Sequence, residues 1–314
     1  MSKIVFVDSD LDGTFCRLLF EWFEPDTEIL QSSTGGLLNT LIQNLDLSHF
    51  STVGFADLSP SREIYDQIQA AGKTIFMWDH HETTRVKTLA GIDNNNYYYD
   101  LGRCSTRLVY DYFRDLHPDM DRDCIREAVM RVDAYDRWED GSPLFQDGKN
   151  LNNILFRHVQ ENRMMSDTKG YDKFVDIQFK KFLLHDHFEF LDNELMIIAE
   201  ENKKEDTKFK RIKKTISLRK DRENRLFGYF ELDSKISIIC SRILKEFPQL
   251  DYVLVYNLFE DNGKFSLRTR KEHIQVNTLA EKYGNGGHKQ AAGLRFLPEQ
   301  REFVDNLRNG TVML

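Results

Sequence analysis

Residues 4–14 read IVFVDSDLDGT: four apolar residues are followed by aspartates at alternate positions, 8, 10 and 12, and then by a glycine. A continuous apolar run of this kind is typical of a strand covered on both faces. Beyond the glycine, apolar residues at helical spacing predict a helix with one buried face, formed by Phe15, Leu18, Leu19, Trp22 and Phe23. The stretch therefore predicts a strand, an acidic turn and a helix, as at the start of an α/β sheet.

Strand and helix signals continue to alternate through the first half of the chain. A weak strand near Ile29 and a helix over residues 37–45 precede a buried strand, TVGFAD, which ends at Asp57. A helix over residues 59–73 follows, and then a second buried strand over residues 73–81, KTIFMWDHH. Repeated strand–helix–strand units predict a mainly parallel sheet with right-handed crossovers.

Aspartate and histidine residues, whose side chains can bind metal ions, follow these strands. Seven of them fall just beyond the carboxyl ends of predicted strands: Asp8, Asp10, Asp12, Asp57, Asp79, His80 and His81. That edge of an open parallel sheet is where ligands bind. A single aspartate there is most often a helix cap or a turn residue. Because so many carboxylates in one place would repel one another without cations, the group predicts a metal site.

A further pair of carboxylates lies on a helix predicted over residues 124–138. Its apolar stripe ends at Val132, and the same helical face continues into Asp133 and Asp136. Carboxylates that extend an apolar stripe lie either at a solvated helix end or in a shared polar cavity. The charged sheet edge favours the cavity.

The composition of the chain limits the number of domains and the classes of ligand that we expect. A chain of 314 residues with 40% hydrophobic and 12% aromatic content can bury a large core and is expected to form two domains. The net charge of -8 argues against tight binding to long duplex nucleic acid, whereas a local cluster of cations suffices for a short nucleotide. Four scattered cysteines without a CxxC pair predict a reduced, cytoplasmic protein. We expect no signal peptide, no membrane span and no membrane partner.

The acidic stretch is compatible with more than one known chemistry. A calcium loop needs a carboxylate at its last position, which is Leu19 on the apolar helix face, so this hypothesis fails. A phosphatase of the haloacid dehalogenase type would use Asp10 as nucleophile and Asp12 as acid. In that family the strand runs directly into the nucleophile, whereas Asp8 and Ser9 intervene here. This second hypothesis is kept as an alternative.

A third hypothesis accounts for more of the chain. DSDLDG (8–13), FAD (55–57), MWDHH (77–81) and RVDAYD (131–136), in this order, resemble the motifs of the DHH phosphoesterase family. GNGGHKQAAG (284–293) resembles the GGHxxAAG signature of the domain that accompanies one branch of the family, and FSLRTR (265–270) resembles its substrate-binding strand. One departure is that many relatives carry histidine at the position of Asp8. A carboxylate there can still bind a hard cation, but it leaves the metal preference open.

The resemblance implies two divalent metal ions. Their ligands would be Asp8, Asp10, Asp12, Asp57, His80 and Asp133, with Asp136 as a near-equal candidate for the place of Asp133. Asp57 would bridge the ions, Asp8 and Asp10 would complete one site, and Asp12 and His80 would belong to the other. Ligands that are mostly oxygen, with one imidazole, suit manganese better than zinc, with magnesium or cobalt as alternatives.

The resemblance also implies roles for the other residues of the Asp-His-His triplet. His81 would contact the phosphate or the leaving oxygen, and Asp79 would orient a histidine from behind. Water activated by the two metals would attack phosphorus, so no protein nucleophile is needed.

The second half of the chain is expected to handle the substrate. A helix near residues 188–201 leads into residues 203–225, which hold 11 basic and 4 acidic residues. A solvated linker is the first interpretation of this segment, and guidance of a nucleotide is the second. Strands over residues 225–232 and 251–259 and a helix over residues 234–247 predict a small α/β domain. The expected substrate-binding residues are Arg103, Arg268, Arg270, Gly286, Gly287 and His288.

We therefore expect an α/β protein with a parallel-sheet metal-binding domain over residues 1–185. A linker over residues 186–210 and a smaller α/β substrate-binding domain over residues 211–314 would follow, with the active-site cleft between the two domains. The resemblance implies hydrolysis of short single-stranded RNA to 5′-mononucleotides. Cyclic-dinucleotide phosphodiesterase, adenosine bisphosphate phosphatase and single-strand exonuclease activities are alternatives within the family. A non-catalytic nucleotide-binding regulator is an alternative outside enzymes, and the C-terminal signature disfavours a pyrophosphatase.

Overall fold

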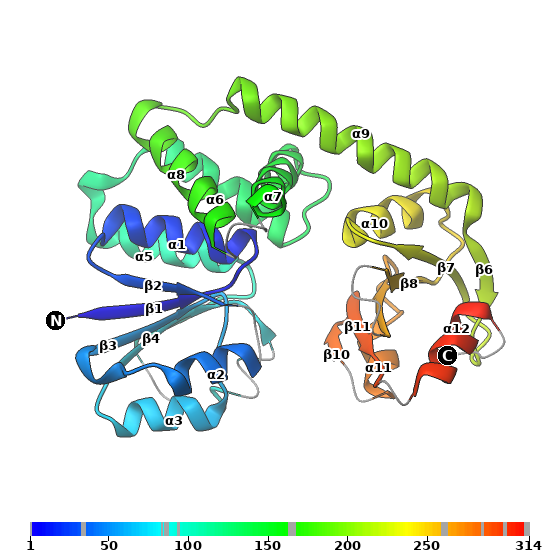
Figure 1. The fold of residues 1–314 in the computed structure, drawn as a ribbon, viewed down its shortest axis with the longest axis horizontal. Coiled ribbons are helices and arrows are strands. Elements are labelled where there is room, and N and C mark those ends of the chain that lie inside the picture. Colours follow the sequence, from blue (N-terminus) through cyan, green and yellow to red (C-terminus); the bar gives the residue numbers. More distant parts are fainter. Residues whose placement is uncertain are drawn as a thin grey trace. The chain divides into compact units, whose positions relative to one another are not determined.

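The computed structural model describes residues 2–32, 36–82, 84, 88–92, 95–162, 168–258, 263–283, 286–297 and 300–310. The chain divides into two compact units, Met1–Ile198 and Ala199–Leu314, and the division falls within the long helix α9 (Asp192–Thr215), as Figure 1 shows. Each unit has its own sheet and its own hydrophobic cores. Among the helices of these ranges, none has the length and apolar character that a membrane crossing requires.

The N-terminal unit is built on a five-stranded sheet in the order β2-β1-β3-β4-β5, and every pairing in it is parallel. Its strands are β1 (Lys3–Val7), β2 (Glu28–Gln31), β3 (Thr52–Ala56), β4 (Thr74–Asp79) and β5 (Tyr97–Tyr99). The prediction of a mainly parallel sheet is confirmed. Because β1, β3 and β4 are neighbours, their carboxyl ends meet at one edge.

Helices cover both faces of this sheet (Figure 1). They include α1 (Leu11–Phe23), α2 (Gly36–Asn44), α3 (Arg62–Ala70), α5 (Ser105–Leu116), α6 (Asp123–Asp136), α7 (Pro143–Asn162) and α8 (Lys169–Leu184), with short 3-10 turns η1 (Leu47–His49) and η2 (Pro118–Met120). Ile4 and Phe6 of β1 share a core with α2 and α3, whereas Val5 and Val7 share the opposite core with α1, α5 and α6. Alternate residues of β1 thus enter different cores, as expected of a strand buried on both faces.

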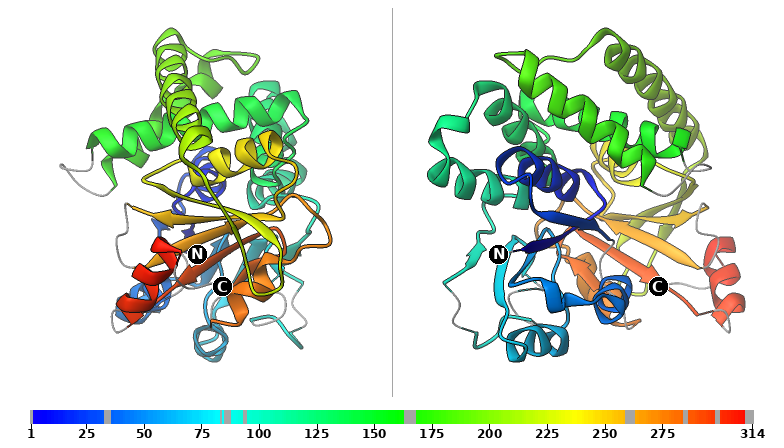
Figure 2. Two further views of the ribbon diagram at one scale, coloured as in Figure 1. Left: turned by 90° about the vertical axis from the view of Figure 1, so that its right-hand side faces the viewer. Right: turned by 60° about the vertical axis from the view of Figure 1, so that its left-hand side comes forward.

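The C-terminal unit has a six-stranded mixed sheet in the order β10-β11-β9-β8-β7-β6. Its strands are β6 (Ser217–Lys220), β7 (Leu226–Leu232), β8 (Tyr252–Asn257), β9 (Lys264–Arg268), β10 (Gly286–His288) and β11 (Ala291–Arg295). One core joins the sheet to α10 (Ile236–Glu246) and the end of α9, and the other joins it to α11 (Val276–Glu281) and α12 (Arg301–Asn309). Figure 2 shows α10 on one face of this sheet and α11 on the other.

The structure corrects the expected helix at residues 188–201. The helix α9 starts later, at Asp192, because Glu194 accepts a hydrogen bond from the backbone N–H of Leu191 (2.8 Å) and so closes the helix start. It then continues to Thr215 through the basic residues. Several of those cations are paired within the C-terminal unit, as Lys213 is with Glu246 (2.5 Å).

Candidate metal centre

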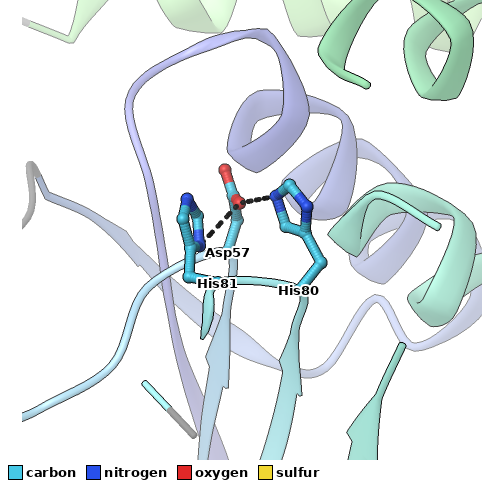
Figure 3. Close-up of side chains that lie close together, drawn as sticks. All are labelled: Asp57, His80 and His81. Atoms are coloured by element: carbon cyan, nitrogen blue, oxygen red, sulfur yellow. Dashed lines mark ion pairs between the residues drawn. The ribbon is translucent and has the colours of Figure 1, made fainter. Parts of the chain in front are cut away.

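Three neighbouring strands of the parallel sheet lead into the candidate centre. Asp8 follows β1, Asp57 follows β3, and Asp79 is the last residue of β4, directly before His80 and His81. Figure 3 shows that Asp57, His80 and His81 point toward one another. The Oδ1 atom of Asp57 lies 3.5 Å from His80 Nε2 and 4.0 Å from His81 Nδ1.

Asp57 has an unusual backbone. Its φ of 64° is left-handed, which is uncommon for a residue other than glycine and is found most often where function requires it. Its N–H still donates to the carbonyl of Trp78 (2.9 Å), so the residue stays attached to β4 while the chain turns. Burial raises the pKa of the Asp57 carboxyl well above its usual range, and the nearby carboxylates of Asp12, Asp10 and Asp136 raise it further. An ionised Asp57 therefore needs a neighbouring cation.

The acidic turn between β1 and α1 is held by one glycine. Asp10 is the N-cap of α1, and its side chain accepts a hydrogen bond from the N–H of Gly13 (3.0 Å). A Cβ atom on Gly13 would lie 2.3 Å from the carbonyl oxygen of Asp8, so no other residue fits. This contact keeps Asp8 close to the first turn of α1. Burial and the neighbouring Asp10 raise the pKa of Asp8 to about 7.

His80 contacts a second group of carboxylates. Its Nε2 atom lies 3.7 Å from Asp12 Oδ2 and 3.3 Å from Asp136 Oδ2, in addition to the contact with Asp57. Burial lowers the pKa of His80, so its ring is neutral at pH 7 and can offer a lone pair. The buried Oδ2 atom of Asp136 has no hydrogen-bond partner among the described residues. Two groups could each hold a cation: Asp57 with His80 and His81, and Asp12 with His80 and Asp136.

Asp133 has a different environment, although it lies one helical turn from Asp136. Its Oδ1 atom accepts from the backbone N–H of Cys104 (2.7 Å), and its Oδ2 atom accepts from Arg107 (2.9 Å). Arg137 also approaches Oδ2, at 3.6 Å. Asp133 Oδ2 is paired with Arg107, whereas Asp136 Oδ2 lies 3.3 Å from His80 Nε2, so the geometry favours Asp136 over Asp133, which was the first candidate from the sequence.

The first turn of α5 supports the centre, and the sequence analysis did not identify it. The backbone N–H groups of Ser105 and Thr106 donate to the two carboxylate oxygens of Asp12, at 2.8 and 2.7 Å. The hydroxyl of Ser105 donates to Asp57 (3.2 Å). A helix N-terminus stabilises negative charge in this way. The only sequence signal was a Ser-Thr pair at a helix start, which ordinarily indicates a cap.

Asp79 and His81 form a tight pair behind the centre. Asp79 Oδ1 accepts from the backbone N–H of His81 (2.9 Å) and lies 2.7 Å from its Nδ1. Burial opposes ionisation of Asp79, but the hydrogen bond from His81 outweighs it and keeps the pKa of Asp79 below its usual value. Burial likewise opposes a charge on His81, and the bond to Asp79 still raises the pKa of His81 to about 9. His81 is therefore cationic at neutral pH.

The predicted substrate-binding residues lie in two places. Arg103 of the N-terminal unit is paired with Asp100 (3.0 Å) and Asp111 (2.9 Å). In the C-terminal unit Arg268 donates to Ser237 Oγ (3.1 Å) and Arg270 donates to Ser241 Oγ (3.2 Å), so both arginines reach α10.

The glycine-rich segment forms the hairpin β10–β11, in which position 288 pairs with Ala291 and Ala291 pairs with Arg268. Gly287 has a φ of +147°, and a Cβ there would lie 2.6 Å from the carbonyl oxygen of Ala291. The hairpin itself therefore requires this glycine. The backbone of Gly286 and His288 belongs to β10, whereas the side chain of His288 lies outside the described part of the structure.

Comparisons with known proteins agree with this arrangement. The DHHA1 domain family matches residues 230–309. The oligoribonuclease NrnB of Bacillus subtilis (strain 168) is 26% identical over 94% of this chain and 73% of its own length. The C-terminal unit therefore matches a DHHA1 domain, and the motifs of the N-terminal unit resemble those of the DHH phosphoesterase family.

Two solved structures share the fold of this chain. RecJ from Thermus thermophilus, in complex with Mn²⁺, matches with a TM-score of 0.59 and 12% identity, over 99% of this chain and 52% of RecJ. The pGpG-specific phosphodiesterase PggH from Vibrio cholerae matches with a TM-score of 0.53 and 15% identity, over 99% of this chain and 98% of PggH. The DHHA1 match confirms the predicted resemblance to the DHH family, and these structures confirm the predicted fold class.

The residues at this sheet edge fit divalent cations. The buried carboxylates of Asp57 and Asp136 have raised pKa values, His80 is a neutral imidazole beside them, and Oδ2 of Asp136 accepts no hydrogen bond among the described residues. Oxygen ligands with one imidazole are the donor set of manganese and magnesium sites.

Proposed function

We propose that this protein is a metal-dependent phosphodiesterase that hydrolyses short oligonucleotides to 5′-mononucleotides. The observation that carries the proposal is the cluster of carboxylates around His80, whose Nε2 lies within 3.7 Å of Asp12, Asp57 and Asp136. The similarity to an oligoribonuclease over 94% of the chain supports the substrate class. The acidic net charge of -8 agrees with a short substrate rather than a long duplex.

Two divalent ions, manganese first among the candidates, would be held by Asp8, Asp10, Asp12, Asp57, His80 and Asp136. Asp57 is the natural shared ligand, because its carboxylate contacts His80 and His81 and is affected by Asp10 and Asp12. When bound, the ions supply an activated water and stabilise charge on the phosphoryl oxygens. Asp133 is left out of this set and instead anchors α5 and Arg107.

His81 would act on the leaving group. Asp79 holds the Nδ1 side of the ring, and the raised pKa keeps the ring protonated at neutral pH. The Nε2–H group can then donate to the oxygen that departs from phosphorus, or to a phosphoryl oxygen as charge develops on it. The bond to Asp79 also fixes the ring orientation before substrate arrives.

The C-terminal unit would bind the nucleotide. Arg268 carries no ion pair among the described residues, and its guanidinium is held by Ser237 and the carbonyl of Leu267 (3.0 Å). A cation without a carboxylate partner can bind a phosphate without first breaking an ion pair. Arg270, just after β9, donates to Ser241 of the same helix α10, and the GGH hairpin of β10 runs beside β11 in the same sheet.

The experiment that tests the proposal is a substrate panel with Mn²⁺. It compares RNA and DNA of two to ten nucleotides with a 30-nucleotide single strand, cyclic dinucleotides and adenosine 3′,5′-bisphosphate. We expect the fastest turnover on the shortest RNA, release of 5′-mononucleotides, and complete loss of activity with EDTA. If the protein preferred a cyclic dinucleotide or the bisphosphate, that compound would replace short RNA as the proposed substrate.

Two other results would contradict the proposed chemistry itself. Full turnover in excess chelator, or a phosphorylated Asp10, would favour the haloacid dehalogenase type of phosphatase. Tight nucleotide binding without any hydrolysis would favour a regulator.

A further inference from the structure

Two arginines converge on Asp133 beside the candidate metal centre. Arg107 Nη1 lies 2.9 Å from Asp133 Oδ2, and Arg137 Nη1 lies 3.6 Å from the same oxygen. Asp133 is 2% exposed, whereas the side chains of both arginines are 30% exposed. A buried anion thus holds two cations where solvent can reach them. Neither arginine was a candidate in the sequence analysis.

Arg107 has N–H donors that no described residue uses. A guanidinium carries five N–H donors in a planar fork. Within the described ranges of the chain, the side chain of Arg107 makes one hydrogen bond, to Asp133. Arg137 has a second partner, Glu139, at 2.8 Å, so it is the less available of the two.

The elements that carry this pair also carry the centre. Arg107 lies in the first turn of α5, directly after Ser105 and Thr106, which contact Asp57 and Asp12. Asp133 lies one helical turn before Asp136 on α6. The guanidinium of Arg107 is therefore held by an aspartate one helical turn from a proposed metal ligand, on a helix whose first residues contact two others.

The charges of the centre indicate why a cation is needed there. The proposed ligands include five carboxylates, from Asp8, Asp10, Asp12, Asp57 and Asp136, against which two divalent ions supply four positive charges. Asp79 is paired with His81. A phosphodiester would add a further negative charge to a centre that is already negative. Glu139 balances Arg137, so it is Arg107 whose remaining N–H donors are available to an anionic substrate.

We propose that Arg107, held by Asp133, binds a non-bridging oxygen of the phosphate that occupies the metal centre. The ligand class is a phosphodiester or a phosphomonoester anion, which the guanidinium fork matches in shape. Asp133 is then a positioning residue that acts through Arg107. This inference rests on the proposed function, because it assigns a substrate contact to the same site.

The test compares Arg107→Gln and Arg107→Lys with Arg114→Gln, a control on the same helix whose arginine is paired with Asp111 and Asp115. Turnover is measured on a two-nucleotide RNA and on bis-p-nitrophenyl phosphate, which offers a phosphate but no nucleotide. Calorimetry gives the affinity of the Mn²⁺-loaded protein for 5′-AMP and its affinity for Mn²⁺. Arg107→Lys keeps the charge toward Asp133, so it serves if Arg107→Gln does not fold.

We expect Arg107→Gln to lower kcat/KM on both esters, and the affinity for 5′-AMP, by about tenfold to a hundredfold with Mn²⁺ affinity unchanged. Arg107→Lys should show a smaller loss of the same kind, because the charge stays but the fork is gone. Arg114→Gln should match the wild type.

The proposal is overturned if Arg107→Gln stays within about twofold of the wild type in 5′-AMP affinity and in both rates. It is also overturned if Mn²⁺ affinity falls in parallel with both rates and with the 5′-AMP affinity, since Arg107 would then serve only to balance the charge of Asp133. A wild-type protein that hydrolyses the generic ester but no oligonucleotide would contradict the proposed function alone. The comparison of Arg107 variants on the generic ester and on 5′-AMP would still decide this inference.

Discussion

The sheet edge of the N-terminal unit carries negative side chains, whereas the arginine-bearing strand of the C-terminal unit carries positive ones. In the first, carboxylates with raised pKa values are buried together, and Asp57 adopts a left-handed backbone. In the second, Arg268 and Arg270 lie on or directly after β9 and reach serines of α10, with no comparable cluster of buried charge among the described residues of that unit.

The difference indicates which unit is arranged to bind metal ions. Like charges held together are costly and persist only when the surrounding fold fixes them, as Gly13 and the first turn of α5 do here. Such a site is arranged for cations. In the second unit, Arg268 is held by hydrogen bonds to neutral groups, Ser237 and the carbonyl of Leu267, which suits binding of an anion. We therefore expect metal chemistry in the first unit and substrate recognition in the second.

The largest expected effect comes from removing the shared carboxylate. Asp57→Asn keeps a residue that tolerates the left-handed backbone but removes the charge. We expect kcat on a short RNA to fall about a thousandfold or more, while the circular dichroism spectrum stays that of the wild type. Asp66→Asn, on the exposed face of α3 beside Arg62, is the matched control and should be fully active. Wild-type turnover in Asp57→Asn would contradict the assignment of the metal centre to the first unit.

A second comparison separates the two aspartates of α6. Asp136→Asn should weaken Mn²⁺ binding and lower kcat by about a hundredfold or more, because its carboxylate faces His80. Asp133→Asn should keep Mn²⁺ affinity within a few-fold but lower the free energy of unfolding by about 1–3 kcal/mol, since it weakens the contacts with Cys104 and Arg107. Calorimetry with Mn²⁺ and urea unfolding measure the two effects. An exchange of the two phenotypes would make Asp133 the ligand.

A change in the second unit should be smaller and selective. Arg268→Gln is expected to lower kcat/KM on the short RNA by roughly tenfold to a hundredfold, through loss of a charge-assisted contact to phosphate. Turnover of bis-p-nitrophenyl phosphate and Mn²⁺ affinity should not change. Lys282→Gln, an exposed residue paired with Glu223, is the control. Loss of activity on the generic ester would instead place Arg268 in the catalytic centre.

The smallest expected effect is on the stability of the metal-free protein. The pKa of Asp8 rises from 3.8 to about 7 and that of His81 from 6.5 to about 9 on folding. Both groups bind protons more tightly when folded, so their contributions are complete below the lower value and disappear as the pH rises through the higher one. Asp79, whose pKa is lowered, contributes constantly above pH 4.

The melting temperature in EDTA should therefore fall by several degrees between pH 5 and pH 9. Asp8→Asn should flatten the lower half of this curve, and Mn²⁺ should flatten all of it by replacing protons with cations. A curve that rises with pH in EDTA would show that the carboxylates do not repel one another.

Much of this account follows from local sequence patterns. The alternation of apolar runs and amphipathic helices gave the order of β1, α1, β3, α3 and β4, and a parallel sheet brings the ends of its strands together regardless of side-chain detail. The sequence placed Asp133 first and Asp136 a near-equal second, because helical spacing puts both on one face. What separates them is Arg107, together with the backbone N–H of Cys104.

The supporting contacts were harder to foresee. Ser105 and Thr106 look like an ordinary helix start, and nothing in the sequence states that their N–H groups meet a carboxylate 93 residues earlier. The left-handed backbone of Asp57 is likewise a product of tertiary contacts, since aspartate alone does not require it. Long-range pairing of this kind is visible only once the sheet and α5 are assembled.

The most direct test of the central claim counts the metal ions that the N-terminal unit binds. Calorimetry of the full chain with Mn²⁺, repeated on Asp57→Asn and on Arg268→Gln, separates the two units in one measurement. We predict two ions per chain for the wild type and for Arg268→Gln, and fewer than two with much weaker affinity for Asp57→Asn. Equal binding by the wild type and Asp57→Asn, or no binding by the wild type, would contradict the assignment of the metal centre to the acidic sheet edge.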